Sequence, residues 1–398
     1  MKTHLITTIL VLFVVCKIHS ESFSLALEKS SDLNTWTAVP ISSAMLSSEG
    51  RIVVDKDIGV SSAFFRLKIT ETPTATPTET AEKWSFLGSL TDNANWGRQI
   101  SSYAGSIYSL SENGGNFVKY DLTTKIFSNL ARPPFSTWGS VYKWLNGKYY
   151  LIGGYNSSKT LSYDPNTNLW TTLADAPRQG FFQAVALSGK IYLIGGTPGG
   201  LANYYSQCSA FDPSSGWSVL PSLPTARSGA AVISEGSDIY VLGGADSTSS
   251  LPSSTVYKFN TQISSWSMLP NMPTSRTYAQ AISDNGNIYI IGGYPQSDQN
   301  ALVGFSPSPL EKYQISSGSW ISLPSFQFSG GTLYSGITIL NGSLYMLNNG
   351  QRFDLAKNQW FSLLPCPEVV VGELHTFNGK IYWVSAHTTL LSVYEYTP

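Results

Sequence analysis

The sequence predicts an all-β protein, a seven-bladed β-propeller preceded by a small N-terminal β module. Two alternating repeats predict it: a strand-like segment carrying a Tyr, and an aromatic residue followed three positions later by Leu. Each recurs seven times after residue 83. The composition agrees, because aromatic residues reach 13% of the chain while charged residues make up only 12%, about half the usual share.

The first repeat is an apolar strand that holds a Tyr and ends in Gly-Gly in its four strongest copies. Those copies hold Tyr150, Tyr192, Tyr240 and Tyr289, and weaker copies hold Tyr108, Tyr345 and Tyr382. Successive tyrosines are 42, 42, 48, 49, 56 and 37 residues apart. Such spacings are typical of a four-stranded unit with loops of variable length.

The second repeat pairs an aromatic residue with a Leu three positions later. Its copies are Trp84-Leu87, Phe127-Leu130, Trp170-Leu173, Trp217-Leu220, Trp266-Leu269, Trp320-Leu323 and Trp360-Leu363. A further strand lies between the two repeats and ends in Asp at 119–121, 162–164, 209–212 and 352–354. The equal number of copies of the two repeats predicts seven blades.

Each four-stranded unit carries apolar side chains on both faces, so it is not stable alone. Radial stacking against neighbouring units buries both faces and leaves only short edges. The repeated Trp fills the wedge between adjacent blades, each indole burying about 150–250 Å². Consecutive glycines at a strand end permit close backbone approach or a positive φ.

The order of the repeats predicts how the ring closes. Trp84 opens the series without a preceding Tyr strand, while Tyr382 and the VYEY segment at 393–396 end it without a following Trp strand. We therefore expect residues 84–90 to complete the last blade. A six-bladed ring would leave one strand of each kind unpaired.

The Gly-Gly strand (YYLIGG at 149–154), the Tyr-Asp strand and the Trp strand together resemble the kelch repeat of the galactose oxidase/kelch superfamily. The resemblance covers about four-fifths of the chain. The resemblance implies two enzyme precedents, galactose oxidase and the kelch-type sialic-acid epimerases. Galactose oxidase holds copper with two His and two Tyr, one His directly following a Tyr. This chain has only His375 and His387 beyond the N-terminal segment and no Tyr-His pair, so we expect no metal and no cofactor.

The N-terminal eighty residues predict three further segments. Residues 1–20 are typical of a signal peptide, with Lys2 before an apolar run from Leu5 to Val15 that is too short to span a membrane as a helix. Residues 21–70 contain four short strand-like stretches and predict a β-sandwich-like module. Residues 71–83 form a Pro/Thr linker, and the propeller is expected over 84–398. We expect a secreted or cell-surface location.

After signal removal only two cysteines remain, Cys208 and Cys366, which lie 158 residues apart. An exported chain permits a disulfide, but bridging needs close Cβ atoms, so two part-buried thiols are the favoured interpretation. The near-neutral charge, −1 overall, excludes a clustered basic surface for nucleic acid.

Long loops at 197–207, 245–255 and 294–311 are predicted to converge on one face, and loops of this length are often functional. Three arginines recur in phase there. The ligand-binding candidates are Arg178, Arg227, Arg276, Tyr204, Tyr205 and Tyr294. An arc of guanidinium groups would hold a carboxylate. The alternative, which we favour, is that the arginines satisfy carbonyl groups of the blades.

These features predict a non-catalytic binding protein that recognises a protein or a glycan through this face. The alternative is an enzyme of the sialic-acid epimerase (mutarotase) type, which the kelch resemblance implies as a second precedent. Epimerisation needs paired acid and base groups, for which Glu311, Glu368 and Glu373 are available. No catalytic residue is assigned. A scaffold built from an anchoring N-terminal module and the propeller is a third possibility.

Overall fold

A computed structural model describes the propeller in most of its length and the strands of the N-terminal segment. The described residues are 11–13, 23–30, 37–39, 51–53, 64–71, 84–91, 98–112, 116–135, 138–198, 203–246, 251–294, 308–326, 336–347, 350–364, 366–367, 372–385 and 390–398. The chain divides into two compact units, Met1–Thr76 and Pro77–Pro398. Among the described residues, no helix has the length and apolar character needed to cross a membrane.

The N-terminal unit contains two small antiparallel sheets. Three strands pair in the order β3-β2-β5: β3 (Thr37–Val39), β2 (Phe23–Ser30) and β5 (Phe64–Glu71). The second sheet pairs β1 (Val11–Phe13) with β4 (Arg51–Val53). The four strands expected over 21–70 thus form, and one of them pairs with a strand from the segment predicted to be the signal peptide.

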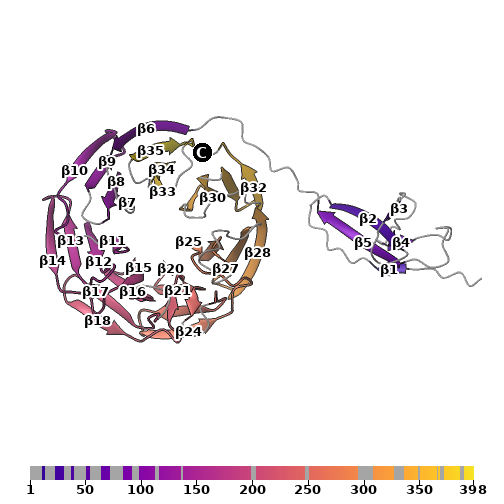
Figure 1. The fold of residues 1–398 in the computed structure, drawn as a ribbon, viewed down its shortest axis with the longest axis horizontal. Helices are drawn as coiled ribbons and strands as arrows, with labels where there is room; N and C mark the ends of the chain where they lie inside the picture. Colours follow the sequence, from indigo (N-terminus) through magenta and orange to yellow (C-terminus); the bar gives the residue numbers. More distant parts are fainter. Residues whose placement is uncertain are drawn as a thin grey trace, which may run out of the picture. The chain divides into compact units, whose positions relative to one another are not determined.

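The second unit is a ring of seven four-stranded antiparallel sheets, with no α-helix in its described residues (Figure 1). Within each blade the first strand faces the middle of the ring and the last forms the rim. Blade 1 contains β7 (Arg98–Tyr103), β8 (Ser106–Ser111), β9 (Phe117–Asp121) and β10 (Ile126–Leu130); blade 2 contains β11 (Val141–Leu145), β12 (Lys148–Ile152), β13 (Thr160–Asp164) and β14 (Leu169–Leu173); blade 3 contains β15 (Phe181–Leu187), β16 (Lys190–Thr197), β17 (Cys208–Asp212) and β18 (Gly216–Leu220).

The remaining blades repeat this order. Blade 4 contains β20 (Ala231–Glu235), β21 (Asp238–Leu242), β23 (Val256–Asn260) and β24 (Ser265–Leu269), with a small accessory pair β19 (Arg227–Ser228) and β22 (Ala245–Asp246); blade 5 contains β25 (Gln280–Asp284), β26 (Asn287–Ile291), β27 (Ser308–Gln314) and β28 (Ser319–Phe326); blade 6 contains β29 (Thr338–Leu340), β30 (Ser343–Met346), β31 (Gln351–Asp354) and β32 (Gln359–Ser362); blade 7 contains β33 (Gly372–Phe377), β34 (Lys380–Ser385), β35 (Leu390–Tyr396) and β6 (Trp84–Thr91).

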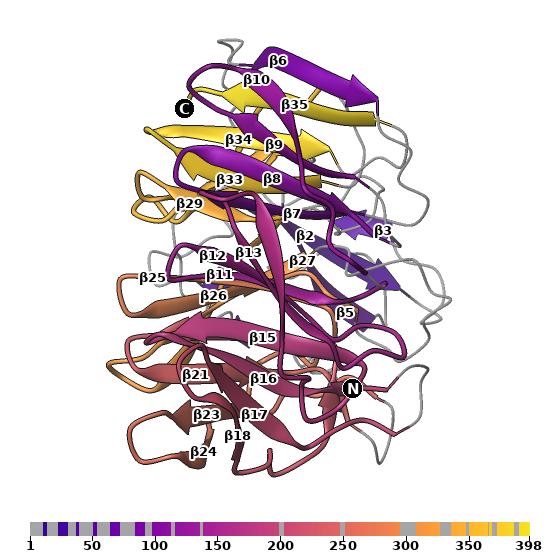
Figure 2. The ribbon, with the colours of Figure 1, turned by 90° about the vertical axis from the view of Figure 1, so that its left-hand side faces the viewer.

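The last blade is completed by the strand that enters the propeller first. β6 pairs antiparallel with β35, placing Trp84 opposite Tyr396 and Thr91 opposite Leu390. The two strands lie side by side in both ribbon views (Figures 1 and 2). The predicted closure, and with it the count of seven blades, is confirmed.

The hydrophobic core lies between blades rather than within them. One cluster joins Ile194 and Cys208 of blade 3 to Ile239, Val241 and Phe259 of blade 4, and six further clusters follow around the ring. Every blade therefore depends on its neighbours for burial, as a stack of thin sheets requires.

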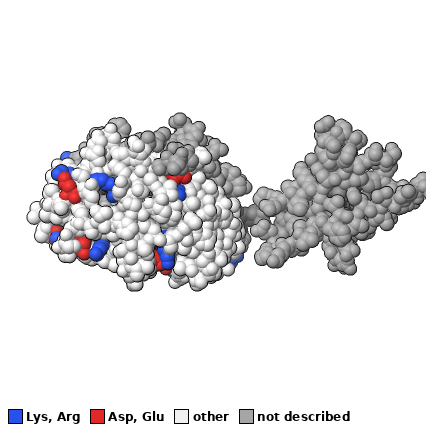
Figure 3. Space-filling model, turned by 90° about the horizontal axis from the view of Figure 1, so that it is seen from below, with Lys and Arg blue, Asp and Glu red and all other residues white. Residues whose placement is uncertain are grey.

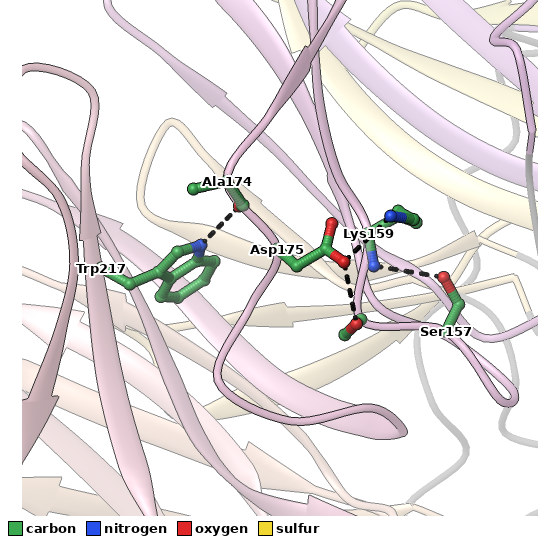
Figure 4. Close-up of polar contacts among 6 residues, drawn as sticks. Ser157, Lys159, Ala174, Asp175 and Trp217 are labelled. Atoms are coloured by element: carbon green, nitrogen blue, oxygen red, sulfur yellow. Dashed lines mark hydrogen bonds and ion pairs between the residues drawn. The ribbon is translucent and has the colours of Figure 1, made fainter.

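The tryptophans of the rim also bond adjacent blades together. In six blades the indole Nε1 donates to the carbonyl that follows the repeat Leu of the preceding blade. The pairs are Trp84–Leu364, Trp170–Ala131, Trp217–Ala174, Trp266–Pro221, Trp320–Pro270 and Trp360–Pro324, at 2.7–3.0 Å. Figure 4 shows the Trp217 bond. In blade 1 the equivalent residue is Phe127, which has no such donor.

The Gly-Gly pairs let the chain entering the next blade approach closely. At Gly195 and Gly243, φ is +53° and +65°, and an added Cβ would lie 2.8 Å and 2.4 Å from the carbonyl oxygens of Arg227 and Arg276. Only glycine adopts this conformation in so little space. The glycines therefore set the distance between blades 3, 4 and 5.

Candidate functional site

The connections between second and third strands lie on the same face as the connections between blades, and we call this the loop face. Backbone contacts join the two kinds of connection, for example Gly154 with Gly180 and Thr277 with Tyr294. Much of the three long loops, including residues 199–202, 247–250 and 295–307, lies outside the described residues. The candidate site residues that the structure describes therefore lie on the remaining parts of this face and on the inner strands.

The three repeated arginines make equivalent contacts within their own blades. Each donates to the carbonyl of the first glycine of the Gly-Gly pair: Arg178 to Gly195, Arg227 to Gly243 and Arg276 to Gly292, at 3.2, 3.4 and 3.0 Å. Each also contacts the segment leading into the third strand, through the Gln207 carbonyl, the Thr255 hydroxyl and the Pro309 carbonyl respectively. In blade 2 the hydroxyl of Ser140 makes the bond to the Gly153 carbonyl.

The most deeply placed of these arginines is paired with a carboxylate. Arg276 is 0% exposed, and its Nη2 lies 2.8 Å from Glu311 Oε2, which is equally buried. Thr274 donates a short hydrogen bond to the other carboxylate oxygen of Glu311. Glu311, one of the acid or base candidates, is thus part of a buried ion pair inside blade 5.

The arginines bond blade carbonyls, as the favoured interpretation from sequence expected. Arg227 is 3% exposed and Arg276 fully buried, whereas Arg178 is half-buried and lies over the rings of Phe182 and Tyr205 at 4.8 and 5.2 Å. Of the three, only Arg178 presents a surface that a ligand reaches in this conformation. A ligand role for the arginine arc stays a prediction.

The three candidate tyrosines are half-buried on the loop face. Tyr205 donates to the Gln179 carbonyl at 3.2 Å. Tyr294 meets Tyr278 edge to face, with ring centroids 6.4 Å apart, and Tyr278 is 48% exposed. The structure thus places Tyr205 beside Arg178. Tyr294, which follows the second strand of blade 5, contacts Tyr278, which lies in the connection between blades 4 and 5.

An exposed aromatic patch lies where blades 2 and 3 meet on the loop face, and sequence reasoning missed it. Trp138 and Tyr155 are 53% and 51% exposed, and Phe181 lies 4.8 Å from Trp138 and 6.4 Å from Tyr155 between ring centroids. The aromatic patch is Trp138, Tyr155 and Phe181. Trp138 falls outside the rim-Trp repeat, as do four other tryptophans, so no sequence feature singles it out.

The edge of the aromatic patch is polar but carries little net charge. Lys159, four residues after Tyr155, pairs with Asp175 at 2.9 Å, and Ser158 donates to the same carboxylate (Figure 4). Figure 3 views the ring from its rim, where basic and acidic atoms are sparse among the described residues and lie mostly beside one another.

A second group of functional side chains lies on the inner strands of blades 7 and 2. Glu373 and His375 come from β33, and Tyr142 and Lys143 come from β11; we call these four residues the axial cluster. The Tyr142 hydroxyl donates to Glu373 Oε1 at 2.9 Å, and His375 Nε2 lies 4.0 Å from Glu373 Oε2. Glu373 is 38% exposed and His375 10%.

Burial shifts the pKa of every member of the axial cluster. It raises the pKa of Glu373 to about 7, although the Tyr142 hydroxyl and Lys143 act in the opposite direction. It lowers the pKa of His375 to about 4 and lowers that of Lys143, while Glu373 acts to raise the latter. Burial and the Glu373 charge hold the pKa of Tyr142 well above 10. A carboxyl group that titrates near neutral pH is suited to proton transfer.

The other sequence candidates are less informative. His387 and Glu368 lie outside the described residues. Cys208 and Cys366 are free and buried, so the prediction of two thiols rather than a disulfide is confirmed. In the part of the chain that the structure describes, no three His, Cys, Asp or Glu side chains are placed to hold a metal ion.

Comparison with known proteins identifies the repeat. The kelch motif family model matches residues 226–273, which span blade 4 from β19 through β24. The chain is a kelch-repeat β-propeller. It is similar to Kelch-like protein terF of Aspergillus terreus, with 29% identity over 164 residues, 36% of this chain and 35% of that protein. It is also similar to Kelch-like protein 15 of Danio rerio, with 29% identity over 152 residues, 32% of this chain and 25% of that protein.

The fold comparison extends the match to the whole ring. The solved structure of YjhT superposes with a TM-score of 0.51 at 16% sequence identity, covering 76% of this chain and 97% of YjhT. At that identity the likeness shows the fold alone. The chain spans about a third or less of the length of its kelch relatives, so their whole-protein activities and partners do not transfer.

Proposed function

We propose that this kelch-repeat protein is a binding protein that recognises a partner protein through its loop face, with the aromatic patch as the anchor. Kelch propellers generally bind proteins. The observation that carries the proposal is the exposure of Trp138 and Tyr155, each more than half exposed beside Phe181. Large aromatic side chains dominate the energetics of protein interfaces, and an exposed group of them marks an interaction surface.

The finer parts of the proposal rest on the sequence. Export through the N-terminal segment would bring the propeller to the cell surface or the medium. A glycan is the alternative ligand, because aromatic rings also offer flat apolar surface to sugar rings. The low charge of the chain, with 12% charged residues, fits either ligand, since neither requires a strong electrostatic field.

The experiment compares binding by the full-length protein and by a Trp138→Ala/Tyr155→Ala double variant. The wild type is screened against a glycan array and against proteins labelled at the surface of the source organism. We expect the double variant to lose at least about thirtyfold in affinity for the captured ligand, as for loss of an interface hot spot. Ile263→Ala is the matched control, because Ile263 is 73% exposed in a turn on the opposite face. Unchanged affinity of the double variant would refute the proposal.

An enzyme of the sialic-acid epimerase type is the second candidate, and the axial cluster is the observation that favours it. Glu373 titrates near neutral pH and contacts the Tyr142 hydroxyl, which gives an acid and a base within reach of one another. The arginines first considered for this role bond blade carbonyls instead. Absence of turnover of a carboxylated sugar by the wild type would exclude this candidate. Turnover that survives Glu373→Gln would exclude Glu373 as its acid or base.

A further inference from the structure

We propose that the axial cluster is a binding site for a small oxyanion, a carboxylate in the simplest case, and that Lys143 and Tyr142 hold it while Glu373 controls its occupancy through protonation. This site is independent of the loop-face function, because none of its residues belongs to the aromatic patch. The two proposals therefore fail separately.

The groups of the axial cluster come together from two blades. β33 and β11 belong to blades 7 and 2, which flank blade 1 in the ring, and the Tyr142 hydroxyl reaches Glu373 across that interval at 2.9 Å. Glu373 is 38% exposed, and Tyr142 and Lys143 are both half-buried. Solvent and small solutes therefore reach the polar groups of the cluster.

The charge of Lys143 is not balanced by a close carboxylate among the described residues. Among the described residues, no carboxylate lies within 4.0 Å of its amine, whereas other lysines of the ring, such as Lys148 and Lys190, have such partners. Burial lowers the pKa of Lys143, which is the expected response of an ammonium group that lacks a close counter-ion. An anionic ligand would supply that counter-ion together with a hydrogen bond from Tyr142.

The histidine and the tyrosines around Glu373 keep one charge state near neutral pH. Burial keeps the His375 pKa near 4 and the pKa values of Tyr142 and Tyr149 well above 10, so all three are neutral around pH 7. Glu112 also acts on Tyr142. Burial raises the pKa of Glu112, while its bonds to the Gly139 amide and to Gln99 act in the opposite direction.

Protonation of Glu373 therefore decides how the cluster treats an anion. When its carboxyl group is neutral, it no longer repels an anion or competes for Lys143. It then also has a proton to donate, so the cluster offers three donors, and the Lys143 amine lies 5.9 Å from the centre of the Tyr142 ring. His375 contributes no competing charge, because its Nε2 is buried and has no hydrogen-bond partner among the described residues.

The test measures acetate binding to the full-length protein by ligand-observed NMR at pH 6 and pH 8. Acetate stays ionised throughout, and acetamide is the uncharged control ligand. With a Glu373 pKa of about 7, the neutral fraction falls about tenfold between these pH values, and we expect acetate affinity to fall about tenfold with it. Acetamide should show no such dependence.

Three variants separate the roles. Glu373→Gln fixes the neutral form and should hold the pH 6 affinity of the wild type at both pH values. Lys143→Met should lose acetate binding at both. Lys148→Met, on the neighbouring strand and paired with Asp164 at 3.6 Å, should behave as the wild type. Absence of acetate binding to the wild type at pH 6 would overturn the proposal. So would a Glu373→Gln variant that keeps the tenfold loss, a result that stands even if Lys143→Met fails to fold.

Discussion

Replacing Trp266 tests whether the rim indoles hold the blades together. Trp266 is half-buried, its ring lies 4.9 Å from that of Phe259, and its Nε1 donates to the Pro221 carbonyl of the preceding blade at 2.8 Å. Truncating a fully buried Trp costs about 3–5 kcal/mol. Because part of this ring is exposed, we expect Trp266→Ala to lower the free energy of unfolding by about 2–3 kcal/mol.

Trp266→Phe separates the hydrogen bond from the packing. It keeps an aromatic ring in the wedge but removes the donor, so we expect a loss of about 1 kcal/mol. Blade 1 shows that the substitution is sterically acceptable, because Phe127 occupies the equivalent position and packs 4.5 Å from Tyr120.

The assay is urea denaturation of the purified protein, followed by circular dichroism and by intrinsic fluorescence. Val219→Ala is the control, since Val219 is 81% exposed on the rim strand of blade 3, and such a substitution changes stability by less than about 0.5 kcal/mol. The reasoning is wrong if Trp266→Ala costs no more than this control. It is also wrong if the Phe variant is destabilised as much as the Ala variant, because packing would then contribute nothing.

Two further predictions concern buried ionisable groups. Arg276→Met should lower the free energy of unfolding by about 3–5 kcal/mol, because it leaves the Glu311 carboxylate buried without its partner; Arg227→Met, which orphans no carboxylate, should cost clearly less in the same urea assay. Burial lowers the pKa of His375 from 6.5 to about 4, so protonation favours the unfolded chain and stability is lost as the pH falls below 6.5. The His375 contribution to this loss is about 2 kcal/mol at pH 5 relative to pH 7, while the raised pKa of Glu373 stabilises the folded chain as the pH falls and so acts in the opposite direction. The stability of His375→Gln relative to the wild type should therefore increase by about 2 kcal/mol between pH 7 and pH 5; an equal difference at the two pH values would contradict the assignment.

The fold was predictable because the chain repeats its local pattern seven times. The spacing of the Tyr strands and of the rim aromatics defines blades without knowledge of any long-range contact. The missing Trp strand after Tyr382 then left one place for Trp84, and β6 occupies it. The role of the arginines was only half predictable, because a guanidinium group suits a ligand carboxylate and a backbone carbonyl equally well. Only the structure shows which of these Arg276 contacts.

The axial cluster and the aromatic patch were not predictable for a different reason. Tyr142 and Glu373 are 231 residues apart, and their contact depends on the register of two inner strands and on the curvature of the ring. Glu373 was available as an acid or base candidate, but nothing in the sequence paired it with Tyr142. Trp138 is one of five tryptophans outside the rim repeat, and Trp96 likewise lies just before an inner strand, so the sequence does not single Trp138 out.

Departures from the repeat coincide with both candidate sites. Blades 3, 4 and 5 keep the Gly-Gly pair and its arginine, and these residues bond the blades internally. Blade 2 replaces the arginine with Ser140 and carries Trp138, Tyr142 and Lys143 close by in sequence. The repeated residues satisfy backbone groups that every blade shares, so they leave little freedom for a ligand. Positions that do not bond these backbone groups are free to vary. Functional groups are therefore expected where a blade departs from the repeat. The same criterion directs mutagenesis of this ring to blades 7, 1 and 2 before the arginine-bearing blades.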